Sequence, residues 1–218
     1  MKAIENSLSA LGVDYIDLYQ LHSPQPQWPI QETMEILVRL KTQGKIRHIG
    51  LSNYTPKETE QAMRFGPIVS SQPRYNMIFT QEDETLKFCK ANEIGVIPHS
   101  VLSKGLLGGK YKPGHTFAPD DERRLFNFFR GSLFETIYEV TEKLKAWAED
   151  RDRDLIQLAV AWVVANPAVT SAIVGMKSVT QVENVAKAAT WKLTSSDLSD
   201  IKNIIGDLSP SWIKDQVS

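Results

Sequence analysis

The chain alternates between stretches whose apolar residues recur every three or four positions and short apolar runs. Ile4, Leu8 and Leu11 share one helical face, and Gly12 follows them as a helix stop. The next run, residues 15–22, is rich in strand-forming residues. Because this succession continues through most of the chain, the sequence predicts parallel strands joined by helical crossovers.

Two segments are typical helix starts. Thr55-Pro56-Lys57-Glu58 is a capping box with proline at the first helical position, and Ser178-Val179-Thr180-Gln181 is a second capping box. A loop rich in glycine, proline and aspartate is expected over residues 105–121. The expected strands are residues 15–22, 46–52, 68–75, 95–100 and 170–175, and the expected helices are residues 4–11, 34–40, 56–66, 81–92, 133–150 and 154–166, with two more beginning near 178 and 195.

These elements predict the α/β class and, more narrowly, an incomplete (β/α)8 TIM barrel of about five parallel strands with flanking helices. A closed barrel of this kind has eight strands over about 250 residues, whereas this chain has 218 residues. No internal repeat or linker interrupts the pattern, so we expect a single domain over residues 1–218.

Composition excludes several classes of protein. A net charge of -1 gives no electrostatic reason to expect nucleic acid or an anionic membrane as a partner, and 42% hydrophobic residues exclude a disordered chain. The single cysteine, Cys89, excludes an intrachain disulfide and a multi-cysteine zinc site, so no metal is expected. The longest apolar stretch, residues 155–165, is about half of what a bilayer requires, and the N-terminus has no signal-peptide core. We therefore expect a cytoplasmic protein.

Polar residues gather where the expected strands end, which is where barrels carry functional groups. Strand alternation places His22 on the inward side with Gln20 and turns Asp17 outward, so Asp17 is expected to be structural. From position alone, His22 could instead be a satisfied core histidine, and Ser52-Asn53 could be a turn or a helix cap.

At these residues the sequence resembles the aldo-keto reductases. Residues 7–22 and 43–54 are similar to two successive signatures of that family. The family's order continues through Gln72 with Tyr75-Asn76, then residues 97–102, 105–111 and 173–178 with Gln181. The chain is thus identified as resembling the C-terminal five-eighths of an NADP-dependent aldo-keto reductase, and the resemblance implies an N-terminally truncated barrel whose first three strands are missing.

The resemblance also implies roles for individual residues. His22 matches the family's catalytic histidine, which orients the substrate carbonyl and donates a hydrogen bond to its oxygen. Asn184 lies three residues after Gln181, whereas the family usually has its asparagine four residues after the glutamine, and this departure puts Asn184 in doubt as an adenine ligand. The residues implied to bind NADP(H) are Ser52, Asn53 and Gln72 at the nicotinamide carboxamide, His99 at the ring, Ser100, Gly105 and Leu107 at the pyrophosphate, and Lys177, Ser178, Gln181 and Asn184 at the adenosine end.

The family's catalytic aspartate, tyrosine and lysine have no counterpart in this sequence. Hydride transfer between NADP(H) and a carbonyl or alcohol is therefore expected to be absent or impaired in the isolated chain. The alternatives are a non-catalytic NADP(H)-binding pseudoenzyme or regulatory subunit, and a complex whose partner chain supplies the missing strands. Open sheet edges are expected to promote self-association along residues 14–22.

The residues implied to bind cofactor do not identify the carbonyl substrate. Four phenylalanines in the insertion 112–131 either line the barrel mouth or pack within a long loop; they are Phe117, Phe126, Phe128 and Phe129.

Overall fold

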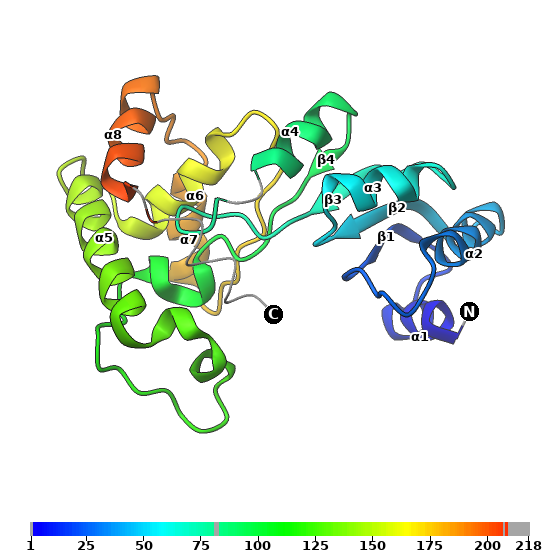
Figure 1. Cartoon of the computed structure of the whole chain (residues 1–218), viewed down its shortest axis with the longest axis horizontal. Coiled ribbons are helices and arrows are strands. Elements are labelled where there is room, and N and C mark those ends of the chain that lie inside the picture. Colours follow the sequence, from blue (N-terminus) through cyan, green and yellow to red (C-terminus); the bar gives the residue numbers. More distant parts are fainter. Residues whose placement is uncertain (1, 81–82, 207, 209–218) are drawn as a thin grey trace. The chain divides into compact units, whose positions relative to one another are not determined.

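The structure, a computed structural model, describes residues 2–80, 83–206 and 208 (Figure 1). Its contacts divide the chain into two compact units. The first consists of Met1–Pro73 and Glu82–Pro98, and the second of Arg74–Gln81 and His99–Ser218. That residues 1–218 form a single domain stays a prediction.

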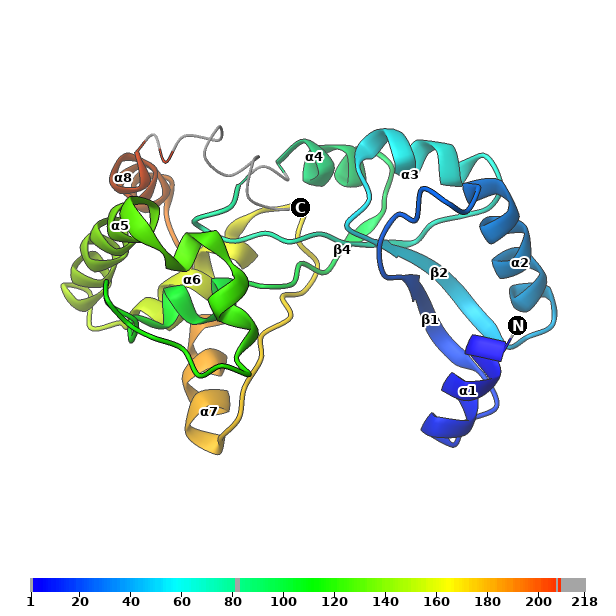
Figure 2. The ribbon, with the colours of Figure 1, turned by 60° about the horizontal axis from the view of Figure 1, so that its bottom comes forward.

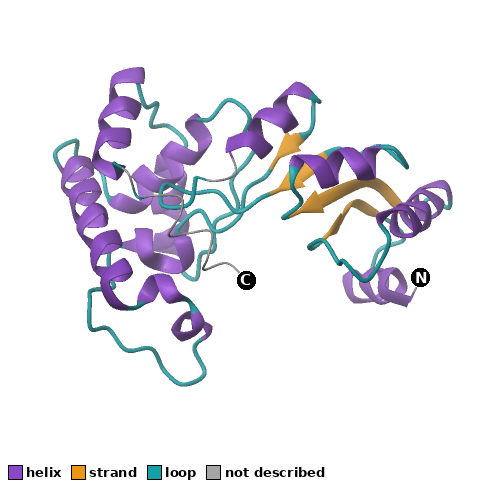
Figure 3. Ribbon diagram, in the orientation of Figure 1, coloured by secondary structure: helices purple, strands orange, loops and turns teal. Residues whose placement is uncertain are grey.

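The first unit is built on a parallel sheet with the strand order β1-β2-β3-β4. The strands are β1 (Ile16–Leu21), β2 (Ile46–Ser52), β3 (Ser70–Gln72) and β4 (Gly95–Val96). Figure 3 shows these strands following one another across the first unit. The predicted α/β class and parallel pairing are therefore confirmed for this part of the chain.

Helices α1 (Lys2–Leu11), α2 (Ile30–Thr42), α3 (Pro56–Met63) and α4 (Asp83–Ala91) accompany the strands. Figure 2 shows α2, α3 and α4 following one another on the same side of the sheet. The predicted start of the fourth helix at residue 81 lies outside the described residues.

Sequence signals explain where these helices begin and which face they bury. Met34, Leu37 and Leu40 lie three residues apart on α2 and are all buried. Thr55 caps α3, since its hydroxyl accepts from the Glu58 N–H while the Glu58 carboxylate accepts from the Thr55 N–H. The first predicted capping box is therefore confirmed.

The second unit consists of helices around an aromatic core. Phe128 and Phe129 are 4% and 5% exposed, and Phe117 and Phe126 pack against the same cluster. Of the two interpretations of these phenylalanines, packing is thus confirmed. Helix α8 lies along α5 in Figures 1 and 2. The helices are η1 (Ser103–Gly108), η2 (Glu122–Leu125), η3 (Asn127–Phe129), α5 (Gly131–Glu149), α6 (Leu155–Ala165), α7 (Val179–Ala188) and α8 (Ser195–Ile205).

The prediction of five strands was wrong in one place. Residues 170–175 form no strand in the described part of the chain, and Ile173 is 44% exposed. The sequence pattern reports the preference of each residue, whereas a strand also needs a hydrogen-bonded neighbour in register. For the same reason the third and fourth predicted strands shrink to three and two residues.

No helix among the described residues is long and apolar enough to span a bilayer.

Candidate functional site

Three of the expected site residues lie on one face at the carboxyl ends of neighbouring strands. Gln20, Gly50 and Ser70 pair across β1, β2 and β3, and Ser52 pairs with Gln72 one step further along. Because side chains two residues apart on a strand share a face, His22 follows Gln20 just as Ser52 follows Gly50. Strand register therefore aligns Ser52 with Gln72, and His22 is the first residue beyond β1 at the same edge of the sheet.

Asn53 ties these strand ends together. Its Nδ2 donates to the main-chain oxygen of His22 and to the Ser52 hydroxyl, both over 3.0 Å. The Ser52 hydroxyl in turn donates to the main-chain oxygen of Gln72 over 2.9 Å. Ser52 is 3% exposed, so its hydroxyl is first a structural link and only its remaining lone pair could accept from a ligand.

The Gln72 amide is held on one side only. Its Nε2 donates to Gln20 Oε1 over 3.0 Å, and Gln20 Nε2 donates to the Ser70 hydroxyl over 3.1 Å. Gln72 Oε1 forms no hydrogen bond with a residue that the structure describes, and the side chain is half-buried. Gln72 therefore presents an acceptor on the face of the sheet that Gln20 occupies.

A cavity of about 530 Å³ adjoins the end of β1. Its lining includes His22, the loop residue Trp28, and Tyr54 with Gln61 from the α3 region. Burial, with the nearby Glu58 carboxylate adding to it, raises the pKa of the Tyr54 phenol. A tyrosine that donates a proton near neutral pH needs a lowered pKa, so Tyr54 is not suited to that role.

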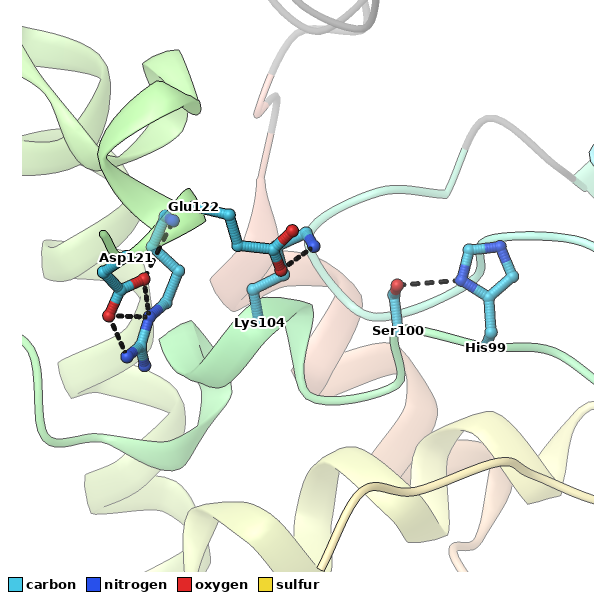
Figure 4. Close-up of polar contacts among 6 residues, drawn as sticks. His99, Ser100, Lys104, Asp121 and Glu122 are labelled. Carbon is cyan, nitrogen blue, oxygen red and sulfur yellow. Dashed lines mark hydrogen bonds and ion pairs between the residues drawn. The ribbon is translucent and has the colours of Figure 1, made fainter. Parts of the chain in front are cut away.

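In the second unit, His99 and Ser100 contact each other directly. His99 Nδ1 lies 2.8 Å from the Ser100 hydroxyl (Figure 4). Ser100 has φ 57, and its main-chain oxygen accepts from the buried Asn76 Nδ2 over 2.9 Å. A fixed but strained turn therefore carries both residues at the point where the chain enters the next loop.

The loop 103–108 departs from regular helix. Ser103, Lys104 and Gly105 all have positive φ, at 47, 52 and 98. The N–H groups of Gly105 and Leu107 both donate to the main-chain oxygen of Leu102, over 2.8 and 3.2 Å, so they are engaged within the loop. Leu107 is fully buried, backbone included.

The same loop carries a cation and is joined to the aromatic insertion. Lys104 Nζ lies 2.7 Å from Glu122 Oε1 (Figure 4). The same ammonium lies 4.5 Å from the centre of the Phe126 ring. The neighbouring Asp121 accepts from Arg123 Nε over 2.8 Å. These side-chain hydrogen bonds, with the Arg123 N–H, lower the pKa of Asp121 to about 2. The insertion beside the loop is thus held by charged pairs.

The start of α7 brings Lys177, Ser178 and Gln181 together. The Ser178 hydroxyl accepts from the Gln181 N–H over 3.3 Å, but Gln181 Oε1 accepts from the Lys177 N–H over 2.6 Å rather than from Ser178. The predicted second capping box is therefore only half formed, because the glutamine side chain reaches one residue further back. The Lys177 ammonium is exposed and pairs with no carboxylate in the described part of the chain.

Asn184 lies in a separate network. Its Oδ1 accepts from Gln157 Nε2 over 2.7 Å, and its Nδ2 donates to Asp154, the residue that caps α6. Both ends of the Asn184 amide are thus engaged by α6, which agrees with the doubt raised by its spacing from Gln181. Gln157 is 6% exposed, and its Oε1 has no hydrogen-bond partner among the described residues.

The available donors suit an organic ligand. The histidine, cysteine and carboxylate residues that the structure describes form no group of three able to hold a metal ion. The first unit offers amide, hydroxyl and imidazole groups at His22, Asn53 and Gln72, and the second offers a glycine loop and an exposed lysine at a helix N-terminus.

Comparison with known proteins identifies the family of this chain. The family model described as "Aldo/keto reductase family" matches residues 1–205. The chain belongs to the aldo-keto reductase family. Among curated relatives, the aldo-keto reductase YhdN of Bacillus subtilis is 35% identical over 94% of this chain and 62% of its own length. The aldo-keto reductase yakc [NADP(+)] of Schizosaccharomyces pombe is 31% identical over 92% of this chain and 60% of its own length.

Solved aldo-keto reductase structures match as well. The glycerol dehydrogenase AKR11B4 of Gluconobacter oxydans superposes with a TM-score of 0.88 at 30% identity, covering 96% of this chain and 64% of that one. The thermostable aldo-keto reductase Tm1743 gives a TM-score of 0.71 at 26% identity, covering 93% of this chain and 65% of that one. The chain thus matches part of this barrel fold and spans about three fifths of the length of the curated relatives it matches.

Two residues, one in each unit, lie near candidate site residues and have no role assigned by the sequence patterns. Gln20 lies two residues before His22, and strand alternation predicts the inward side for both. This spacing was the signal in the sequence that could have marked Gln20 as a candidate site residue. Lys104 precedes Gly105 in the glycine loop, where a basic residue beside an expected phosphate site was a usable signal.

Proposed function

We propose that this chain carries the NADP(H)-binding part of an aldo-keto reductase, an oxidoreductase acting on a carbonyl or alcohol substrate. The observation that best supports the proposal is the hydrogen-bonded row at the ends of β1, β2 and β3. There Asn53 links the His22 backbone to Ser52, and Ser52 links to Gln72.

The residues of the first unit fit the nicotinamide carboxamide. Such an amide needs one acceptor and one donor from the protein. Gln72 Oε1, which accepts no hydrogen bond from the described residues, suits the carboxamide N–H. Asn53 and Ser52 fix the backbone and the strand ends around it.

The residues of the second unit fit phosphate groups. Gly105 and Leu107 remain proposed contacts of the pyrophosphate on the strength of the resemblance alone, since their N–H groups donate to Leu102 in this structure. Lys177 and Ser178 stand at the N-terminus of α7, where a cation and the helix dipole both favour an adenosine 2′-phosphate. His99, Ser100 and Gln181 remain proposed contacts of the same cofactor. Asn184 is the weakest member of the set, since α6 engages its amide.

His22 is proposed to orient the substrate. When bound, NADPH supplies hydride to the carbonyl carbon while the carbonyl oxygen gains a proton. The His22 imidazole is exposed at the end of β1, and we propose that it donates a hydrogen bond to that oxygen; the cavity that it also lines is otherwise formed by the loop after β1 and by residues of α2 and the α3 region. Because Tyr54 has a raised pKa, the first unit offers no tyrosine acid in this cavity. We therefore propose that turnover by the isolated chain is impaired.

Cofactor binding is tested by titrating the full chain with NADPH and NADH and following the change in cofactor fluorescence. We expect saturable NADPH binding, about tenfold weaker in Lys177→Ala, with a smaller effect on NADH. Lys187→Ala removes a lysine from the other end of the same helix and should change neither affinity. Equal weakening by both variants would count against the 2′-phosphate role of Lys177.

Catalysis is tested separately by comparing NADPH-dependent carbonyl reduction with that of a His22→Ala variant. Saturable binding with no turnover above the variant favours the alternative proposal, a non-catalytic NADP(H)-binding pseudoenzyme or regulatory subunit. Steady turnover that is lost in His22→Ala supports an enzyme. If NADPH does not bind at all, both proposals fail.

The cytoplasm is the compartment that we propose. Cys89 is fully buried, and a chain with one cysteine suits a reducing environment without depending on it.

A further inference from the structure

Gln20 crosses a whole strand to reach its partner. Gln20 on β1, Gly50 on β2 and Ser70 on β3 are paired in register, so Gln20 and Ser70 are two strand spacings apart, which is about 10 Å. Even so, Gln20 Nε2 donates to the Ser70 hydroxyl over 3.1 Å. The Gln20 side chain therefore lies flat across the face of β2.

Gly50 makes this crossing possible. A Cβ at residue 50 would collide with the Ser70 hydroxyl and would lie 2.9 Å from Gln20 Cγ and 3.0 Å from Gln20 Nε2. Real Cβ contacts are essentially never that short. The Gln20 amide thus packs directly on the backbone of Gly50. The need for glycine at residue 50 is an observation independent of the hydrogen bonds of Gln20.

The Gln20 amide joins Ser70 to Gln72. Its Nε2 is directed at Ser70, and its Oε1 faces Gln72 and accepts from Gln72 Nε2 over 3.0 Å. The Ser70 hydroxyl can donate or accept, so it holds the Gln20 side chain in place, and the atom that Gln20 turns toward Gln72 determines the orientation of the Gln72 amide. In this arrangement Gln72 presents Oε1, and not its NH₂ group, to the face of the sheet that Gln20 occupies.

We propose that Gln20 is a positioning residue that sets the amide orientation of Gln72, so that this site accepts a hydrogen bond from the carboxamide NH₂ of a nicotinamide dinucleotide. The inference rests on the proposed function and adds the residue that holds the Gln72 amide in its orientation. Gln20 itself touches only Gln72 and Ser70 in this relay.

The test compares NADPH with its 3-acetylpyridine analogue, in which a methyl group replaces the carboxamide NH₂. Calorimetric titration of the full chain should show a preference for NADPH of about threefold to tenfold, the size of one neutral hydrogen bond. In Gln20→Met, which keeps length but cannot hydrogen bond, the preference should fall toward equality. In Gln20→Glu it should return, because a carboxylate still accepts from Gln72 Nε2 while the Ser70 hydroxyl becomes the donor.

The matched control is Gln31→Met on α2, where an exposed glutamine donates to Glu35 over 2.9 Å. This variant should leave the preference unchanged. If Gln20→Met does not fold by circular dichroism, Ser70→Ala removes only the anchor and should weaken the preference in the same direction.

A second readout does not depend on the cofactor. In the wild-type chain without ligand, the side-chain NH₂ resonances of Gln72 should differ from those of an exposed, unbonded glutamine. In Gln20→Met they should move to the values of an exposed glutamine, and in Gln20→Glu they should return toward the wild-type values. If this pattern appears but no dinucleotide binds, the positioning holds and the proposed function fails. If NADPH binds yet neither its preference nor the Gln72 resonances respond to Gln20→Met, the positioning is overturned and the proposed function stands.

Discussion

The side-chain amide of Asn53 donates to the main-chain oxygen of His22 over 3.0 Å, which fastens the turn after β2 to the end of β1. Asn53 has φ 61, a conformation that asparagine tolerates better than most residues. One residue thus supplies both the backbone turn and the bond that holds the candidate catalytic histidine in place.

Replacing Asn53 separates these two contributions. We expect Asn53→Ala to lower the free energy of unfolding by about 1–3 kcal/mol, since it loses the bonds and strains the left-handed turn. Asn53→Gly loses only the bonds and should be less destabilising. Urea denaturation measures both values, and an alanine variant no less stable than the glycine variant would contradict the role of φ at this position.

Gly50 should tolerate no side chain. Gly50→Ala places a Cβ 2.9 Å from Gln20 Cγ, and overpacking of this kind lowers stability by about 1–3 kcal/mol. Gly108→Ala is the matched control, because no atom lies within 4 Å of its Cβ. Combining Gly50→Ala with Ser70→Ala should recover part of the loss in thermal denaturation. Equal losses of stability in Gly50→Ala and Gly108→Ala would argue against the close approach of Gln20 and Ser70 to the backbone of Gly50.

Asp121 should make stability depend on pH in acid. Hydrogen bonds from Arg123 lower the pKa of Asp121 from 3.8 to about 2 in the folded chain. Between those two values the unfolded state binds more protons, so this contribution is present above pH about 4 and is lost as the pH falls toward 2. Urea midpoints measured over that range should fall less steeply in Asp121→Asn than in the wild type. Parallel curves would exclude the Asp121–Arg123 pair as the cause.

Asn184 should matter more for stability than for binding. Asn184→Ala leaves Gln157 Nε2 without its acceptor and Asp154 Oδ2 without its donor, and such a loss costs about 1–3 kcal/mol of unfolding free energy. Asn203→Ala on the exposed side of α8 should change little. NADPH affinity should stay within about twofold in both variants. A large loss of affinity with unchanged stability would restore Asn184 as an adenine ligand.

The edge of β1 should promote self-association. In the described part of the sheet, β1 pairs only with β2, and none of its residues is fully buried. Leu18→Lys places a charge on the half-exposed face and should reduce association measured by light scattering after size exclusion. Leu125→Lys changes a 66% exposed leucine on η2 and serves as the control. A monomeric wild type would refute this expectation.

Local signals explain how much of the fold could be predicted. Met34, Leu37 and Leu40 marked α2 by their spacing, and Thr55 with Glu58 marked the start of α3, because both depend on neighbours a few residues away. The strand at 170–175 was wrong because pairing depends on a distant neighbour that the local pattern does not report. Likewise, Gln181 Oε1 accepts a hydrogen bond from the Lys177 N–H, whereas the capping box predicted from the sequence required the Ser178 N–H.

The sequence by itself determined the family, the alternation of helices and strands, and the strand ends at which His22, Ser52 and Gln72 lie. Those features follow from residue order and spacing, which is what local periodicity records. Only the tertiary structure decided that Gln20 passes over Gly50 to Ser70, that Gln72 therefore turns its oxygen outward, and that α6 engages Asn184. These contacts join residues 27 to 52 positions apart, so side-chain direction and available space, and not sequence spacing, determine them.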